Sequence, residues 1–350
     1  MTAIPPPTAA AGRTLFLAAA VIPVLLGAVA CGSAASGPTS EPASSGLPLT
    51  AVTTAALPGD TSRLDYASID PAAHRLFIAH LGASQIIEVD TTTNQVVKVI
   101  DQIPGVHGVL VVPDRHRVFA TATTSNQVIT LDEDTGTVLS TAPTGDFPDG
   151  LAYDPTTRRV SVTNETGGTE TVLDTDTGQV VATVDVGGDA GNVAYDPVGR
   201  ILVDVQSRDQ VAVIDPPTFT VTRRIDVPGC DHPHGLTLDA DHRLGFIACD
   251  GNATVHTMDL DTYQTSNPQP VGADPDVLAY DPGTARLSVA AESGDVTVLT
   301  EQNRQLSVLG RDHLADGAHV VAVDPSTHRS YYPIASGPSG HPVLLVEANR

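Results

Sequence analysis

Residues 149–188 read DGLAYDPTTRRVSVTNETGGTETVLDTDTGQVVATVDVGG. This stretch predicts four short β-strands, at residues 149–153, 159–164, 169–174 and 179–186, because each is rich in β-branched and apolar residues. The breaks between them, DPTT, ETGG and TDTG, carry the Asp, Pro and Gly residues of tight turns. One such sheet cannot bury both of its faces, so it must pack against similar sheets.

The same pattern recurs along the chain. Its anchor, most often an Asp-Pro pair in the turn after the first strand, returns at steps of 42 or 43 residues, at Asp70, Val112, Asp154, Asp196, Asp239, Asp281 and Asp324. This period and strand count predict an all-β fold, a seven-bladed β-propeller with four antiparallel strands per blade.

The two ends of the repeat region complement each other. Residues 50–59, TAVTTAALPG, match the fourth strand of a repeat, as residues 96–105 and 220–229 do. The last repeat ends one strand short. We therefore expect the N-terminal strand to close the last blade, so that residues 48–350 form one propeller without an open edge there. A ring closed in this way requires no second copy, and we expect a monomer.

Composition excludes one class of partner. The formal net charge is −23, and Lys98 is the only lysine. A phosphate backbone would be repelled, so we expect no nucleic-acid binding. Beyond Val29 no apolar run is long enough to cross a bilayer.

Residues 1–31 have the features of an export signal: Arg13 precedes the apolar run LFLAAAVIPVLLGAVA. AVAC at residues 28–31, followed by Gly32, resembles the lipobox of bacterial lipoproteins, which implies lipidation at Cys31. The alternative is an ordinary secretory signal cleaved near Ala30. Residues 32–47 have the Gly, Ser, Pro and Ala composition of a flexible linker. The expected location is the outer side of the cell membrane, held by the lipid anchor alone.

One position in the repeat carries ionisable residues almost every time. Five residues before each anchor stand Asp65, His107, Asp149, Gly191, His234, Asp276 and His319. The first strand of a propeller blade is innermost, so we expect these seven ring residues to circle one mouth of the central channel. His80, Asn164, Glu165, Gln206, Asp250 and Glu292 follow the second strand and are candidates for the same rim.

The ring predicts a divalent metal site. His107, His234 and His319 are spread nearly evenly over the blades, and three imidazoles suit zinc above other divalent ions. Asp65, Asp149 and Asp276 would orient the histidines or bind the ion directly. Two alternatives stay open, a site for a polar ligand without metal and a ring of ordinary turn residues.

Cys230 and Cys249 flank the first two strands of one blade. In an exported protein the expected outcome is a disulfide. The alternative is a Cys₂His₂ zinc site formed with His232 and His234.

The repeat PDGLAYDPTTRRVSVTNETGGTETVLDTDTGQVVATVDVGG, at residues 148–188, resembles the YVTN-type β-propeller repeat of extracytoplasmic seven-bladed propellers. The resemblance covers residues 48–350. It implies either a binding or scaffold protein, which presents its loop face to a small molecule or a protein, or an enzyme like the related lactonases and streptogramin lyases. We favour the binding protein, because no pairing of nucleophile and base accompanies the ring. The alternative is a metal-assisted lyase or lactonase with a three-histidine site.

Overall fold

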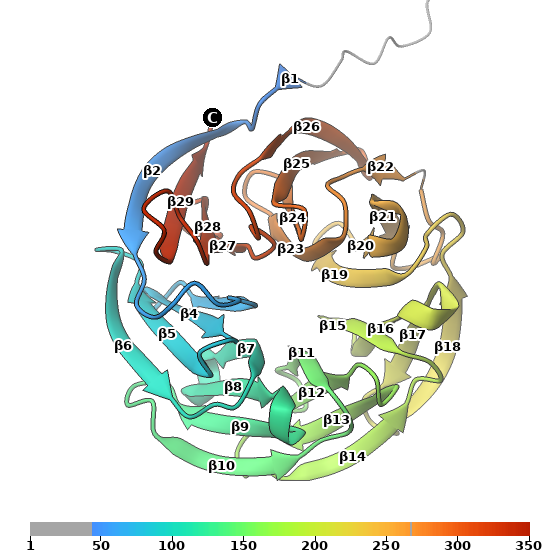
Figure 1. The fold of residues 1–350 in the computed structure, drawn as a ribbon. Helices are drawn as coiled ribbons and strands as arrows, with labels where there is room; N and C mark the ends of the chain where they lie inside the picture. The colour runs from blue at the N-terminus through green and yellow to red at the C-terminus, as the bar shows by residue number, and fades with distance from the viewer. Residues whose placement is uncertain (1–43, 267) are drawn as a thin grey trace, which may run out of the picture. The chain divides into compact units, whose positions relative to one another are not determined.

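The computed structural model describes residues 44–266 and 268–350. Their strands form seven sheets around a central channel, so the predicted seven-bladed β-propeller is confirmed (Figure 1). The expected signal segment 1–31, including Cys31, and residues 32–43 of the expected linker lie outside the described residues. No helix in the described part is long and apolar enough to span a membrane.

Each blade is a four-stranded antiparallel sheet whose first strand lines the channel and whose fourth lies at the periphery (Figure 1). Blades one to three comprise β3 (Ala67–Asp70), β4 (Arg75–His80), β5 (Gln85–Asp90) and β6 (Gln95–Asp101); β7 (Val106–Val112), β8 (Arg117–Ala122), β9 (Gln127–Asp132) and β10 (Val138–Pro143); and β11 (Pro148–Asp154), β12 (Arg159–Asn164), β13 (Thr169–Asp174) and β14 (Val180–Asp185).

Blades four to six continue this order around the ring. They comprise β15 (Ala190–Asp196), β16 (Arg200–Val205), β17 (Gln210–Asp215) and β18 (Thr220–Asp226); β19 (Pro233–Asp239), β20 (Leu244–Cys249), β21 (Thr254–Asp259) and β22 (Gln269–Pro270); and β23 (Pro275–Asp281), β24 (Arg286–Ala291), β25 (Asp295–Gln302) and β26 (Gln305–His313). Short 3₁₀ turns lie at η1 (Pro113–Arg115), η2 (Thr123–Ser125), η3 (Gln206–Arg208) and η4 (Asp250–Asn252).

Blade seven joins the two ends of the chain, as the sequence predicts. β27 (Ala322–Asp324), β28 (Arg329–Ile334) and β29 (Val343–Asn349) supply its inner strands, and β2 (Leu49–Ala56) pairs antiparallel with β29. Pairing of β2 satisfies the edge that the last repeat leaves open. A further short strand, β1 (Ser44–Ser45), pairs in parallel with β26 of blade six.

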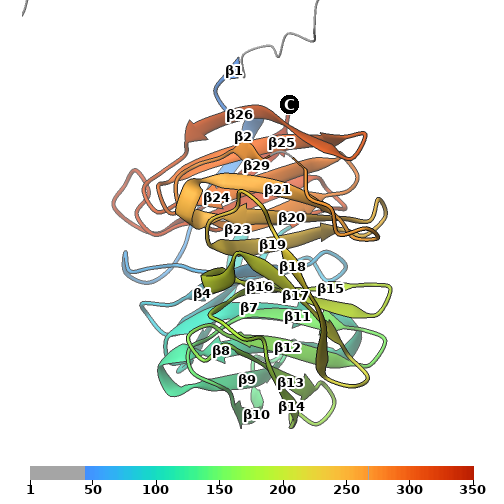
Figure 2. The ribbon, with the colours of Figure 1, turned by 90° about the vertical axis from the view of Figure 1, so that its right-hand side faces the viewer.

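The core is divided among the blade interfaces. Seven clusters of buried apolar side chains lie between adjacent blades, and Figure 2 shows the sheets stacked from the side. Strands such as β8 and β12 are buried over nearly their whole length, because a blade packs on each of their faces. The peripheral β14 is largely exposed. No blade buries its apolar faces alone, which is why the repeats require one another.

Candidate functional site

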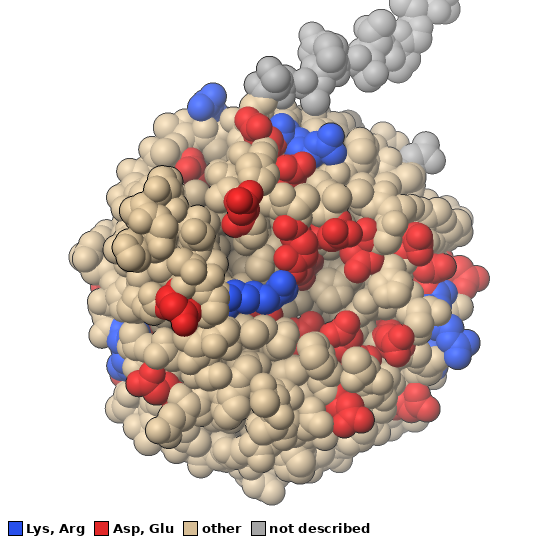
Figure 3. Space-filling view, viewed as in Figure 1, with Lys and Arg blue, Asp and Glu red and all other residues tan. Residues whose placement is uncertain are grey.

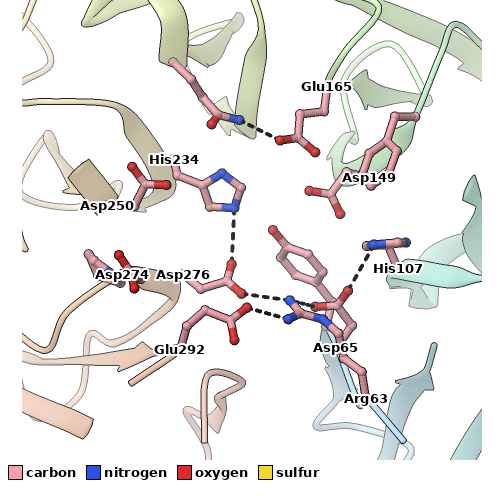
Figure 4. A pocket seen from close by; sticks show the side chains of 14 residues that line it. Arg63, Asp65, His107, Asp149, Glu165, His234, Asp250, Asp274, Asp276 and Glu292 are labelled. Carbon is pink, nitrogen blue, oxygen red and sulfur yellow. Dashed lines mark hydrogen bonds and ion pairs between the residues drawn. The ribbon is translucent and has the colours of Figure 1, made fainter. Parts of the chain in front are cut away.

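Five first strands carry a β-bulge at the ring position. The pairing register with the second strand shifts there in β7, β11, β15, β19 and β23. A bulge leaves residues out of the ladder and turns the side chain away from the regular alternation. The bulged residues are His107, Asp149, Gly191, His234 and Asp276, and the four that have side chains lie at the mouth of the channel (Figure 4).

Close packing of neighbouring first strands explains the glycine that often follows a ring residue. A Cβ atom on Gly108 would lie 2.1 Å from the backbone oxygen of Asp149, and one on Gly235 would lie 2.4 Å from that of Asp276. Any side chain at these positions would push the blades apart. The glycines therefore hold the ring residues of adjacent blades close together.

Five of the seven ring residues, all but Gly191 and His319, line an acidic cavity of about 240 Å³. Seven of its lining residues are carboxylic acids, namely Asp65, Asp149, Glu165, Asp250, Asp274, Asp276 and Glu292. Among the described residues that line it, Arg63 is the only Lys or Arg. Figure 3 shows acidic side chains around the hollow at the centre of this face. The cavity is thus strongly negative unless its histidines carry charge.

The ring histidines pair with ring aspartates. His234 Nε2 lies 3.2 Å from Asp276 Oδ1, and His107 Nε2 lies 3.7 Å from Asp65 Oδ2. His319, just before β27, places Nε2 3.6 Å from Asp65 Oδ1 and donates through Nδ1 to the Gly317 carbonyl, 2.9 Å away. The latter contact fixes Nδ1 as the protonated nitrogen, because a carbonyl only accepts.

The His234–Asp276 pair is an ion pair near neutral pH. Burial disfavours the charged form of His234, but its hydrogen bond to Asp276 and the charges of Asp149 and Glu165 raise the pKa of His234 to about 10. Burial also opposes ionisation of Asp276, yet His234 and Arg63 hold the pKa of Asp276 below its usual value. The pKa of His319 is raised in the same way, by Asp65 and Asp276 against the effect of burial.

Arg63 forms ion pairs with the carboxylates on one side of the cavity. Its guanidinium lies 2.5 Å from Glu292 Oε1, 3.3 Å from Asp65 Oδ1 and 3.6 Å from Asp276 Oδ2 (Figure 4). Arg63 comes from the segment before β3, which lies outside the regular strands. It adds a positive charge beside carboxylates that the ring histidines also contact.

Asp149 is the ring residue with no such partner. Its side chain points into the cavity from β11, in blade three (Figure 4). The residue is only 5% exposed, and no described residue hydrogen-bonds to its buried Oδ1. Burial, and then repulsion from Asp65, raises the pKa of Asp149 well above its usual range. A buried polar atom left unpaired is costly, so this oxygen is a natural contact point for a ligand.

Tyr66 lines the acidic cavity and hydrogen-bonds to Asn192, which does not line it. The Tyr66 hydroxyl donates to Asn192 Oδ1 at 2.8 Å, which joins blade one to blade four across the channel. Both residues also line a second cavity of about 340 Å³, whose other walls include Ile69, Leu110 and Leu278. The hydrogen bond therefore lies between the acidic cavity and a second cavity whose lining residues are mostly apolar.

The rim residues divide into two groups. Glu165, Gln206, Asp250 and Glu292 line the cavity, as expected. Gln206 Nε2 lies 3.3 Å from Glu165 Oε1 and so orients that carboxylate. His80 and Asn164 are directed elsewhere: His80 contacts Ser62 Oγ at 3.2 Å, and Asn164 Oδ1 accepts from Gly145 N at 3.0 Å. These two hold loops in place.

The three predicted imidazole ligands do not come together as one set. In the described chain, the metal-like group at the ring consists of Asp65, Asp276 and His319, with ligand atoms within 4.8 Å of one another, and includes neither His107 nor His234. Both carboxylates of this group also contact Arg63. A metal ion would have to take the place of the guanidinium.

Cys230 and Cys249 are joined in the structure. Their Sγ atoms are 1.98 Å apart and their Cα atoms 5.4 Å apart. Cys230 precedes β19 and Cys249 ends β20, so the antiparallel pairing of these strands brings them together. Bonded sulfur atoms are not thiolates, so in this arrangement they do not bind zinc with His232 and His234. His234 is paired with Asp276 instead.

Sequence reasoning missed Arg63, Tyr66, Phe147 and Asn192. For Tyr66 and Asn192 a signal was present: they occupy the position after the ring residue, where other repeats have Gly108, Gly150 and Gly235. Phe147 makes an edge contact with His107, with ring centroids 5.1 Å apart. Arg63 lies in a segment that is not part of the repeat, so the repeat pattern could not identify it.

No model of a known protein family matches this sequence, and no curated protein matches it either. Solved structures do share the fold. Kuenenia stuttgartiensis hydrazine synthase is 15% identical with a TM-score of 0.71, over 81% of this chain and 96% of that one. The RRP9 WD40 repeats are 14% identical with a TM-score of 0.72, over 85% and 99%. At such identities the likeness shows the propeller fold alone.

Proposed function

We propose that this chain is an exported, membrane-tethered propeller of the YVTN type that binds a small ligand in the cavity at the mouth of its channel. The observation that carries the proposal is Asp149, a buried carboxyl group aimed into the cavity with an unpaired oxygen. Ordinary turn residues would be satisfied within their own turns. The bulges and glycines of the first strands hold this ring in a fixed geometry, which favours binding.

A ligand screen tests this function. Thermal shift with a panel of cationic, anionic and neutral metabolites should identify a stabilising compound, because a ligand that binds only the folded state raises the melting temperature. Asp250→Trp, at the cavity wall, should abolish the shift. The matched control is Asp241→Trp, in the exposed turn after β19 at the other end of the blade. An equal shift in both variants would place the ligand elsewhere and contradict the proposal.

Tethering rests on the sequence, through AVAC at residues 28–31 and the linker that follows. Cys31→Ala should move the protein from the membrane fraction to the soluble fraction, because no described helix is apolar enough to hold it there. Mass spectrometry of the N-terminal peptide should find the lipid on residue 31. Unchanged attachment of the variant would contradict lipidation.

A metal-assisted lyase or lactonase is the second candidate. The observation that favours it is the proximity of Asp65, Asp276 and His319, a carboxylate and imidazole set that a divalent ion such as zinc accepts. Zinc would supply a Lewis acid there, and Arg63 would have to withdraw. Metal analysis of wild-type protein and of Arg63→Ala tests this. Zinc bound by the wild type and lost in Asp276→Asn would support the site, whereas zinc bound only after loss of Arg63 would contradict it.

A further inference from the structure

Only some of the carboxyl groups in the cavity form ion pairs with Arg63. Arg63 contacts Asp65, Asp276 and Glu292, so one half already holds a guanidinium group of the protein itself. On the side away from Arg63 lie Asp149 and Glu165, and Arg63 makes no ion pair with either of them (Figure 4). His234 interacts electrostatically with both of them, but its ion pair is with Asp276.

The open half is shaped for a positive charge. The carboxyl groups of Asp149, on β11, and Glu165, after β12, point into the same part of the cavity (Figure 4). Gln206 orients Glu165 from the next blade. The buried Oδ1 of Asp149 has no hydrogen-bond partner in the part of the chain that the structure describes. Two carboxyl groups that face the cavity and make no ion pair with a described residue can accept charge-assisted hydrogen bonds from a ligand.

The geometry points to an organic cation: we propose that the ligand carries a primary ammonium or guanidinium group, bound between Asp149 and Glu165 in the half of the cavity that Arg63 leaves open. This inference rests on the proposed ligand-binding function and names its ligand class. Arg63 provides the internal precedent, a guanidinium held by three carboxylates of the same cavity.

The same residues discriminate against a bare divalent ion in this half. Neither Asp149 nor Glu165 belongs to any described group of three ligand atoms within 4.8 Å. A divalent ion needs several oxygen or nitrogen ligands at about 2.0–2.6 Å, whereas an ammonium or guanidinium group donates hydrogen bonds to carboxylate oxygens at the longer N···O distance of about 2.7–2.9 Å. Phe147 and Tyr66 add aromatic surface to the wall, which favours organic cations over hydrated ions.

Binding should be linked to proton release. The groups that face Asp149 are Asp65, before β3, Glu165, His234 and Asp276. Three of these are acids that oppose ionisation of Asp149, and His234 favours it. A cation placed beside Asp149 adds to the effect of His234 and drives the carboxyl group to ionise. Affinity for the cation should therefore increase with pH.

Calorimetric titration with four matched probes tests the inference: n-butylammonium, methylguanidinium, n-butanol and butyrate. The two cations should bind and the neutral and anionic probes should not. Heats measured in buffers of different ionisation enthalpy should report proton release. Asp149→Asn keeps the shape of the side chain and should weaken cation binding roughly ten- to hundredfold, the loss expected for one charge-assisted hydrogen bond.

The control variant is Glu170→Gln, on β13, which replaces a buried acid outside the cavity and should leave cation affinity unchanged. Unfolding curves verify that both variants fold. Equal binding of n-butanol or butyrate, unchanged cation affinity in Asp149→Asn, or failure of both cations to bind at millimolar concentration would overturn the ligand class. The proposed function would survive each result if the metabolite screen still found a compound blocked by Asp250→Trp, and would fall if it found none.

Discussion

Buried aspartates lie at both ends of the first strands, but they have different roles at the two ends. At one end lie the anchor aspartates, defined as Asp70, Asp154, Asp196, Asp239, Asp281 and Asp324. They are buried and accept hydrogen bonds from their own turns: Asp154 Oδ1 accepts from Thr156 N at 2.8 Å, and Asp324 Oδ1 accepts from Ser326 N at 2.8 Å. At the other end lie the ring aspartates Asp65, Asp149 and Asp276.

The ring aspartates are just as buried, but no turn satisfies them. Asp276 relies on His234 and Arg63, and Asp149 and Asp65 each keep a buried oxygen without a hydrogen-bond partner among the described residues. The pKa values follow this contrast. Burial opposes ionisation of Asp324, but Ser326 and Thr327 hold the pKa of Asp324 below its usual value, whereas the pKa of Asp149 is raised. Local hydrogen bonding marks a structural carboxylate, and its absence marks one available to a ligand.

Asp196→Ala should give the largest loss of stability. Its carboxylate binds both Arg200 and Arg243, with Arg200 Nε and Arg243 Nη2 each 3.0 Å from Oδ2. Removing it leaves the partly buried Arg200 without its ion pair and leaves Arg243 only the exposed Asp261, at an expected cost of about 3–5 kcal/mol. Urea unfolding measures the loss. If Asp196→Ala lost no more stability than the ring variant Asp149→Ala, the anchor aspartates would not be more important for stability than the ring aspartates.

His234→Gln should show a pH-dependent loss. The folded-state pKa of His234 is about 10, above the unfolded value of about 6.5. Its ion pair with Asp276 therefore stabilises the fold fully below pH ~6.5, and this stabilisation disappears as the pH rises towards ~10. We expect the variant to be less stable than wild type by about 2 kcal/mol near pH 6 and equal to it near pH 10. A difference that is constant with pH would contradict the ion pair.

Asp149→Asn should stabilise the fold. Because the folded-state pKa of Asp149 is above its unfolded value, the acid favours unfolding as the pH rises above ~4, and the amide avoids this. We expect a gain of about 1 kcal/mol at pH 8 in urea unfolding. Glu170→Gln is the matched case, since burial raises the pKa of Glu170 to about 8 without placing it in the cavity. A destabilised Asp149→Asn would mean that the carboxylate is structural.

Two tyrosines compare the ends directly, and the expected difference between them is only about 1 kcal/mol. The Tyr280 hydroxyl donates to Asp239 Oδ2, a carboxylate, at 2.7 Å, while the Tyr66 hydroxyl donates to the neutral Asn192 Oδ1 at 2.8 Å. Tyr280→Phe should cost about 2 kcal/mol and Tyr66→Phe about 1 kcal/mol, because bonds to charged acceptors are stronger. Thermal unfolding measures both. A larger loss for Tyr66→Phe than for Tyr280→Phe would mean that the hydrogen bond to Asn192 is the stronger of the two, which contradicts this prediction.

The sequence by itself determined the propeller, the blade number and the closure of blade seven by β2. These features follow from local patterns, since the turns DPTT and TDTG and the period of 42 or 43 residues specify where strands begin and end. The sequence also determined which residues form the ring, because the position five residues before each anchor lies at the start of the first strand in each repeat. His319 and Asp65 differ only in lying just before their short first strands, β27 and β3.

Only the tertiary structure decided what the ring residues do. Even spacing of histidines around the blades did not predict that His234 turns to Asp276, or that Arg63 bridges Asp65 and Asp276. Those contacts depend on bulges that redirect side chains, and on a guanidinium from a segment outside the repeat. A repeat pattern specifies the position of each backbone in the ring, but the pairing of buried charges depends on distances between side chains that come from different blades, and those distances are fixed only when the ring closes.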